Sequence, residues 1–339
     1  MRDDATATTA TIERDNAVGI ATRETCVYCQ MSESERLYST SDIFNHQFTI
    51  NRCHHCSAYF LAPPPDAAML AQAYDESYYG AGEDKFSEGL IERVLDYFRD
   101  RRARLVAKLM GGQGRALDIG CGNGRFLSSL GRHGNIDTFG IEIPGGSADR
   151  AAKIAGIKLK LGRLEHGDFD AQYFDAVTLI HVFEHLTEPS MTLDVIHEIL
   201  KPGGLLYMSF PNIDSLQSRW FKGKWLHLDP PRHLFFFGTK EFKKLMAERG
   251  FKLIQESHFN IRYNPFGMQQ SLLNVLLKKR EVLYESLKGN KEYTQEYSGL
   301  SIALQKLFFR FSWPLFIVMG SVEALLKRGA TVDFVFRRL

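Results

Sequence analysis

The sequence predicts an α/β protein whose main domain is a doubly wound, mostly parallel β-sheet of seven strands with helices on both faces. Three observations carry this prediction. From residue 115 onward, short apolar runs typical of strands alternate with amphipathic runs typical of helices. A glycine-rich turn follows the first of these strands. The last strand pattern lies near the C-terminus and follows a long apolar segment. Two Cys-x-x-Cys pairs near the N-terminus predict a further small module.

Composition bounds the functional classes. Of the 339 residues, 44% are hydrophobic, which is ample for a sizeable core. The net charge of +2 argues against a dedicated nucleic-acid surface, so we expect no nucleic-acid partner. The N-terminus lacks a signal pattern and the five cysteines fit a reducing compartment, so we expect a cytoplasmic protein. No run of about 18 uninterrupted apolar residues occurs, so no clear membrane span is predicted.

The chain divides into five predicted parts. Pro63 to Pro65 mark a boundary, and Asp66 is the predicted N-cap of a short helix. Apolar residues at helical spacing predict a longer helix over 88–110. The predicted parts are a flexible N-terminus (1–24), a cysteine module (25–62), a helical linker and cap (63–114), the main domain (115–265 with 329–339) and an apolar helical insertion (266–328).

In the main domain, each predicted strand is followed by a helix or a turn. The strand patterns are residues 115–120, 137–143, 157–162, 174–180, 205–211, 251–262 and 331–338. Helices are predicted over 124–133, 147–155, 190–200 and 239–250. The "KPGG" sequence after residue 200 predicts a helix stop, and Thr239 is the predicted cap of the last of these helices.

The turn after the first strand, "ALDIGCGNGRFL", predicts a ligand cradle. Gly120, Gly122 and Gly124 allow a tight turn and close approach of the backbone to a ligand. Glu142 ends the second strand and can accept hydrogen bonds from both hydroxyls of a ribose. The turn starts with Asp118, which would repel a pyrophosphate but could help to hold a cationic amino-acid end. This favours S-adenosyl-L-methionine over a dinucleotide.

Four motifs in order, "LDIGCGNGRFL", "GIEI", "YFDAVTLIHVFEHLTEP" and "EILKPGGLLYMSFPN", resemble class I S-adenosylmethionine-dependent methyltransferases over about residues 85–262. The resemblance implies a seven-stranded Rossmann-like methyltransferase sheet. It also implies which residues bind the cofactor. Glu142 is expected to bind the ribose, and Ile143 and Leu164 are expected to contact the adenine. Cys121 is expected to be a small spacer in the turn, and the residues expected at the methionine end are Asp118, Gly120, Gly122, Gly124 and His181. Many relatives carry an acid where this chain has Arg163, which leaves the contact to the adenine amino group open.

The paired cysteines, Cys26 with Cys29 and Cys53 with Cys56, predict a structural Zn²⁺ site of four thiolates. Disulfides or free thiols are the alternatives, and His46, His54 or His55 could replace a cysteine. We favour the all-cysteine shell, which leaves no open position for chemistry. A zinc ribbon followed by Tyr74, Tyr78 and Tyr79 resembles the N-terminal modules of some methyltransferases acting on sugars or cell-envelope glycans.

Candidate catalytic residues follow the fourth and fifth strands. Methyl transfer requires an in-line nucleophile and can use a base, and histidine suits that role near neutral pH. His185 or His233 is the predicted base, with Glu184 beside them. The alternatives are that Glu184 and His185 only orient the loop, and that "DPPRH", which contains Arg232 and His233, is a structural turn.

The insertion contains the apolar core "FSWPLFIVMGSV", with Arg310 before it and Lys327 and Arg328 after it. It is predicted to be too short and too interrupted to span a membrane, and to lie instead as a helix or helical hairpin in the membrane interface. Pro314 is predicted to kink the helix or to start a new one. A buried dimer interface or a lid is the alternative.

Together these features predict methyl transfer to an oxygen or carbon of a lipid-linked glycan or a polyprenyl-quinol-like acceptor, by an enzyme peripheral to the inner face of the membrane. A methyltransferase acting on a soluble nucleotide-sugar, with the insertion as a dimer interface, is the second hypothesis. A non-catalytic scaffold is the third. The sequence leaves the oligomeric state open.

Overall fold

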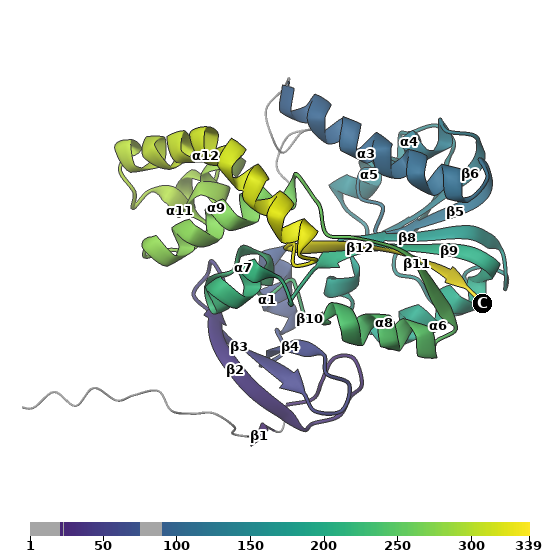
Figure 1. Ribbon diagram of the computed structural model, residues 1–339, viewed down its shortest axis with the longest axis horizontal. Helices are drawn as coiled ribbons and strands as arrows, with labels where there is room; N and C mark the ends of the chain where they lie inside the picture. The colour runs from purple at the N-terminus through teal and green to yellow at the C-terminus, as the bar shows by residue number, and fades with distance from the viewer. Residues whose placement is uncertain (1–20, 23, 75–89) are drawn as a thin grey trace, which may run out of the picture.

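The structure is a computed structural model that describes residues 21–22, 24–74 and 90–339, so most of the predicted flexible N-terminus lies outside the described residues. It contains a seven-stranded sheet with helices on both faces, a smaller N-terminal sheet and a group of helices between the last two strands of the larger sheet (Figure 1).

The larger sheet has the strand order β11-β12-β9-β8-β5-β6-β7. Its strands are β5 (Gln113–Ile119), β6 (Asn135–Glu142), β7 (Ile157–Leu161), β8 (Phe174–Ile180), β9 (Leu200–Pro211), β11 (Phe251–Ser257) and β12 (Thr331–Arg338). Only β12 runs antiparallel, against β9 and β11. The chain reverses direction across the sheet between β5 and β8, where open α/β sheets bind ligands. The predicted α/β fold class is confirmed.

Two layers of helices cover this sheet (Figure 1). On one face, α3 (Leu90–Leu109) and α4 (Arg125–Gly131) pack residues such as Val106 and Leu130 against Ala116 of β5. On the other face, α6 (Pro189–Ile199) and α8 (Thr239–Glu248) bury Ile196 and Phe242 against neighbours such as Leu117. Consecutive residues of β5 therefore point to opposite layers. Helix α5 (Gly146–Ala152) lies beside β7.

Three local predictions differ from the structure. The strand predicted over 251–262 ends at Ser257. Thr239 is the first residue of α8 and not its cap. The carboxylate of Asp214 accepts the Thr239 N–H at 2.8 Å, and this contact could not be predicted because Asp214 lies 25 positions away in the sequence. The "KPGG" stretch follows the end of α6, as predicted, but lies within the first part of β9.

The smaller sheet joins the N-terminal module to the main domain. Its strands are β1 (Ala21–Thr22), β2 (Ser34–Ser41), β3 (Gln47–Cys53), β4 (Tyr59–Ala62) and β10 (Phe235–Phe236). Strand β10 comes from the main domain and pairs antiparallel with β4. Helix α1 (Ala67–Ala73) follows, and the Asp66 side chain caps it by accepting the Met69 N–H at 2.8 Å, as predicted.

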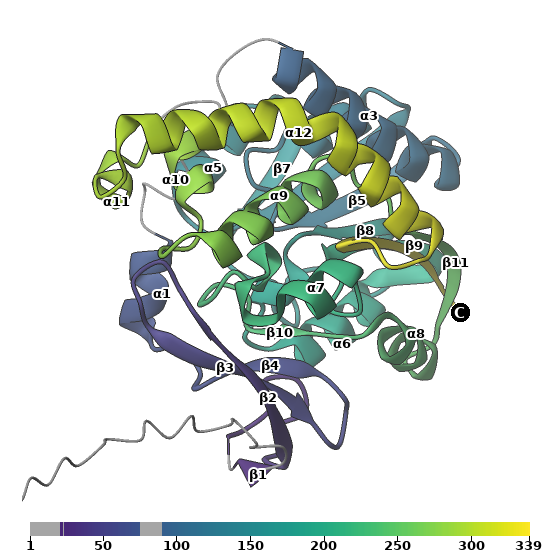
Figure 2. The same ribbon diagram turned by 60° about the vertical axis from the view of Figure 1, so that its left-hand side comes forward.

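The helical insertion begins at Tyr263. It consists of α9 (Tyr263–Leu276), α10 (Val282–Lys288), α11 (Lys291–Thr294) and α12 (Gly299–Leu325), while α7 (Leu216–Phe221) and the short 3₁₀ turns Lys222–Lys224 and Leu226–Leu228 precede it. Helix α12 passes Pro314 without ending, and Figure 2 shows it bent along its length. Among the described residues, one helix, α12 with its 27 residues, is long and apolar enough to cross a membrane by length and composition, so the prediction that this segment is too short was wrong.

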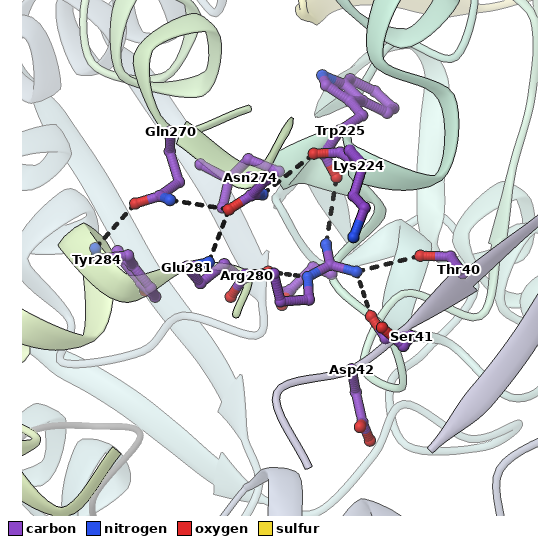
Figure 3. A network of polar contacts seen from close by, with 12 residues as sticks. Thr40, Ser41, Asp42, Lys224, Trp225, Gln270, Asn274, Arg280, Glu281 and Tyr284 are labelled. Atoms are coloured by element: carbon purple, nitrogen blue, oxygen red, sulfur yellow. Dashed lines mark hydrogen bonds and ion pairs between the residues drawn. The ribbon is translucent and has the colours of Figure 1, made fainter. Parts of the chain in front are cut away.

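A buried polar network ties the insertion to the N-terminal sheet (Figure 3). The Arg280 guanidinium donates to Glu281 Oε1 at 2.8 Å, to Thr40 Oγ1 at 3.1 Å and to the Ser41 carbonyl. Glu281 has a φ of 59°, and its N–H donates to Asn274 Oδ1 at 2.6 Å. Since Arg280 and Glu281 are both buried, each charge depends on the other for compensation.

Replacing Arg280 by Met is expected to lower the free energy of unfolding by about 3 kcal/mol, because it leaves the Glu281 carboxylate buried without its cation. Lys244→Met is the matched control. It removes a pair with Glu248 in which both side chains are exposed to solvent, and such pairs contribute less than about 1 kcal/mol. Urea unfolding of both variants measures the difference, and equal midpoints would contradict the assigned role.

Candidate functional site

The glycine-rich turn between β5 and α4 presents open backbone at one position. Gly120, Gly122 and Gly124 all have positive φ, between 57° and 74°. A Cβ on Gly120 would clash with Val182, and one on Gly124 would come within 2.9 Å of Ile157, so packing explains both glycines. Nothing lies within 4 Å of the position that a Cβ on Gly122 would take. The turn therefore has a face at Gly122 that a ligand can approach, which fits the predicted cofactor.

The Glu142 carboxylate lies against this turn. Its Oε2 accepts the Gly122 N–H at 2.6 Å, and its Oε1 accepts the Ile143 N–H at 3.0 Å. Burial raises the pKa of Glu142, while the two N–H donors oppose that shift. Ile143 beside it is 44% exposed, whereas Leu164 is buried in the core. An acid at the end of β6, next to an exposed apolar side chain, suits a ribose and a planar base.

Asp118 and Cys121 support the turn from beneath. The Thr178 hydroxyl donates to Asp118 Oδ1 at 2.5 Å, and burial raises the pKa of this carboxyl to about 7. The Asp118 carboxyl thus points toward β8, and its predicted contact with a cationic amino-acid end stays a prediction. Cys121 packs with Leu127 and Ala151 over Gly140 of β6, where a Cβ on Gly140 would be 2.7 Å from its Sγ.

His181 leaves the end of β8 with a left-handed φ of 56°, an unusual conformation for a residue with a side chain. Its ring centroid lies 4.2 Å from that of Tyr263, and its Nε2 lies 3.4 Å from Ser209 Oγ. Burial lowers the pKa of His181 to about 3, so the ring is neutral near neutral pH. Tyr263 was missed by sequence reasoning because it stands 82 positions away, at the start of the insertion.

The three predicted catalytic side chains come together next to His181. The ring centroids of His185 and His233 are 4.6 Å apart, and Glu184 Oε1 lies 3.9 Å from His233 Nε2 and 3.4 Å from His181 Nδ1. Burial lowers the pKa of His185 to about 4 and also lowers the pKa of His233, while it raises the pKa of Glu184. Near neutral pH the two imidazoles are therefore neutral electron-pair donors.

Backbone pairing fixes this cluster in place. The Leu234 N–H donates to the Glu184 carbonyl at 2.8 Å, and the Leu61 N–H donates to the Leu234 carbonyl at 2.9 Å. Arg232 is paired with Asp229 and donates to the Ala73 carbonyl at 3.3 Å. The "DPPRH" segment thus holds the N-terminal module against the loop after β8, and Arg232 has a structural role. The Tyr74 hydroxyl lies 2.9 Å from His185 Nδ1, whereas Tyr78 and Tyr79 lie outside the described residues.

The four N-terminal cysteines form one cluster, with all four Sγ atoms within 4.8 Å of one another. Cys26 Sγ is 3.7 Å from Cys56 Sγ, and Cys29 Sγ is 3.5 Å from Cys53 Sγ. A tetrahedral ion with Zn–S bonds of about 2.3 Å separates its sulfurs by about 3.8 Å. Gln30 and Ser57, each directly after a second cysteine, share a φ of 60°, so the two knuckles have matching turns. These residues fit Zn²⁺. His46, which could have replaced a cysteine ligand, is hydrogen-bonded to Asp42.

Comparisons with known proteins agree with this geometry. Residues 90–256 match the family model described as "Methyltransferase domain". The chain is 32% identical over 124 residues to a ubiquinone biosynthesis O-methyltransferase of Aeromonas salmonicida (strain A449), covering 35% of this chain and 49% of that protein. It is 27% identical over 193 residues to the protein of the same name from Neisseria meningitidis serogroup C (strain 053442), covering 54% of this chain and 75% of that protein. The chain spans about half to three quarters of the length of these two curated relatives.

Solved structures with similar folds have low sequence identity to the chain. A putative sarcosine dimethylglycine methyltransferase from Galdieria sulphuraria is 15% identical, with a TM-score of 0.49, covering 78% of this chain and 97% of that chain. A geranyl diphosphate C-methyltransferase from Streptomyces coelicolor A3(2) is 15% identical, with a TM-score of 0.46, covering 81% of this chain and 90% of that chain.

Proposed function

We propose, starting from the methyltransferase domain formed by residues 90–256, that the chain transfers a methyl group from S-adenosyl-L-methionine to a hydroxyl oxygen of a polyprenyl-quinol-like acceptor at a membrane surface. The observation that carries the chemistry is the open Gly122 face beside the Glu142 carboxylate. The names of the curated relatives support an oxygen acceptor with an apolar tail. A lipid-linked glycan is the alternative acceptor of the same enzyme.

When bound, S-adenosyl-L-methionine supplies a methyl group on a sulfonium, and the S–CH₃ bond breaks as the new O–CH₃ bond forms. The chain's own residues must then bind the cofactor, orient the acceptor and accommodate the hydroxyl proton. Glu142 would hold the ribose, and the exposed Ile143 would flank the adenine, with the buried Leu164 behind it. His181, Gly120 and the Gly122 face would lie toward the methionine end. His185 and His233, both neutral near neutral pH, are the groups that can accept the hydroxyl proton of the acceptor, with Glu184 beside them.

Helix α12 supports the membrane part of the proposal. Its exposed apolar residues recur every three or four positions and so form one stripe, which we call the α12 stripe: Leu300, Leu304, Leu307, Phe311, Leu315, Val318, Val322 and Leu325. The charged residues of α12 are Lys306, Arg310 and Glu323, and Glu323 is buried. The charges that α12 offers to its surroundings are thus positive, which suits a stripe that inserts among anionic headgroups.

The proposal is tested with the purified chain and a radiolabelled methyl donor. Quinols with polyprenyl tails, embedded in vesicles, are expected to be labelled in a fraction that extracts into organic solvent. Soluble nucleotide-sugars are expected to remain unlabelled. Labelling of the nucleotide-sugars alone would support the second hypothesis, in which the α12 stripe forms a dimer interface. Failure of calorimetry to detect cofactor binding would support the non-catalytic scaffold.

We further propose that the four-cysteine cluster holds a structural Zn²⁺. Elemental analysis is expected to find about one zinc per chain fewer in a Cys26→Ser, Cys53→Ser double variant than in the unmodified chain, because two lost thiolates open the shell. The variant is also expected to unfold at lower temperature, since the ribbon shares its sheet with β10. Cys121→Ser is the control and is expected to retain its zinc. Full zinc content in the double variant would contradict the assignment.

A further inference from the structure

The cluster of Glu184, His185 and His233 is chemically incomplete in the described part of the chain. One ring nitrogen of each histidine and one Glu184 oxygen all lie within 4.8 Å of one another. Glu184 is only 2% exposed, and neither of its carboxylate oxygens accepts a well-formed hydrogen bond from a described residue, although His181 Nδ1 lies 3.4 Å from Oε1. A buried carboxylate without hydrogen-bond donors is costly, so a missing partner is expected here.

The hydrogen bonds of the two histidines fix which nitrogen is available. His185 Nδ1 lies 2.9 Å from the Arg232 carbonyl, and His233 Nδ1 lies 2.8 Å from the His227 carbonyl. A carbonyl can only accept, so each Nδ1 carries the proton and each Nε2 keeps its electron pair, and the Tyr74 hydroxyl, also 2.9 Å from His185 Nδ1, then acts as a second acceptor there. An imidazole that donates one N–H to a carbonyl and offers its other nitrogen is the usual arrangement of a metal-binding histidine.

The surroundings of His233 Nε2 also call for a cation. This atom lies 3.9 Å from Glu184 Oε1 and 3.7 Å from Asp229 Oδ2. An electron pair that faces two carboxylates is repelled by them unless a proton or a metal cation lies between. Arg232 already pairs with Asp229, whereas no lysine or arginine among the described residues hydrogen-bonds to Glu184.

We propose that Glu184, His185 and His233 bind one divalent transition-metal cation, such as Mn²⁺, Fe²⁺ or Zn²⁺. Two imidazoles and a carboxylate suit these ions, and three protein ligands leave an open position. Ligand atoms around a tetrahedral ion are about 3.4 Å apart, so the observed 3.9 Å between His233 Nε2 and Glu184 Oε1 needs only a small side-chain movement.

The role of the ion rests on the proposed function, although its binding does not. The open position would take the acceptor hydroxyl, and coordination would lower the pKa of that hydroxyl, so that its proton would pass to solvent water before methyl transfer. In this arrangement both histidines act as ligands, and neither serves as a free base. The site is separate from the four-cysteine cluster, whose soft thiolates favour Zn²⁺.

The full chain, with its zinc ribbon loaded, is titrated with MnCl₂, and bound Mn²⁺ is counted from the loss of the free-ion electron paramagnetic resonance signal. One ion per chain is expected. Glu184→Gln and His233→Gln are each expected to weaken binding by more than about 100-fold, which exceeds the loss caused by removing a residue that only hydrogen-bonds to a metal ligand. Glu188→Gln, the same change at an exposed position four residues on, is expected to bind like the unmodified chain. Absence of Mn²⁺ binding, or unchanged binding by Glu184→Gln, would overturn the proposal.

Calorimetry with S-adenosylhomocysteine on the same samples separates this proposal from the proposed function. Binding of S-adenosylhomocysteine without binding of Mn²⁺ would sink the cation site and leave the methyltransferase assignment standing. Mn²⁺ binding without S-adenosylhomocysteine binding would do the reverse. Retained S-adenosylhomocysteine binding in the Glu184→Gln and His233→Gln variants shows that they fold. Methyl transfer that continues at full rate in excess chelator would also overturn the cation site, in favour of direct proton transfer to a histidine.

Discussion

Replacement of Glu142 by Ala is expected to weaken S-adenosyl-L-methionine binding by roughly 100- to 10,000-fold. The carboxylate would accept two ribose hydroxyls, and each hydrogen bond to a charged group contributes about 1.5–3 kcal/mol. A loss of about 3–6 kcal/mol corresponds to that change in affinity. Glu142 also accepts the Gly122 N–H at 2.6 Å, so the substitution loosens the turn that the cofactor contacts. Isothermal titration calorimetry measures the effect.

Glu248→Ala provides the matched control for this experiment. Glu248 lies exposed at the end of α8, and its only described partner is Lys244, at 3.7 Å. We expect this variant to bind the cofactor with unchanged affinity. If Glu142→Ala also bound the cofactor as well as the unmodified chain, while its thermal unfolding was unaltered, the assignment of the ribose contact to the end of β6 would be wrong.

The combined substitutions Phe311→Asp and Val318→Asp are expected to abolish binding of the chain to anionic vesicles. Phe311 is 72% exposed and Val318 is 61% exposed, so both can enter a bilayer interface without unfolding the helix. Burying each side chain contributes up to about 1.5–3 kcal/mol, so losing both reduces the partition constant by roughly 100-fold or more. The added carboxylates are also repelled by anionic headgroups. Vesicle flotation measures the bound fraction.

The control carries Leu37→Asp and Phe44→Asp, two exposed apolar residues on β2 and in the loop after it, outside the insertion. It is expected to float with vesicles as the unmodified chain does. Light scattering after size exclusion gives the competing result. If the unmodified chain fails to float and forms a dimer that the α12 substitutions break, then the α12 stripe is a protein interface and the membrane proposal falls.

Local sequence determined the main sheet and the cofactor turn. Strand and helix periodicity depends on residues two to four positions apart, and the spacing of Gly120, Gly122 and Gly124 reports a backbone conformation directly. The spacing within each Cys-x-x-Cys pair is likewise local, so the two knuckles could be predicted, whereas the approach of Cys26 to Cys56 depends on the pairing of β2 with β3. The length of α12 was underestimated because only the apolar core around Pro314 was considered, whereas the helix continues on both sides of this proline from Gly299 to Leu325.

Only the tertiary structure decided which distant residues meet. His233 reaches Glu184 for two reasons. Strand β10, which follows His233 closely in the chain, pairs with β4 of the N-terminal sheet, and the Leu234 N–H, next to His233, donates to the Glu184 carbonyl. Arg280 reaches Thr40 across 240 positions because the insertion folds back onto the N-terminal sheet. Neither contact produces a periodic pattern in the sequence. A buried charge is stabilised only by a partner that the tertiary fold brings to it from another part of the chain, so the contact cannot be predicted from neighbouring residues.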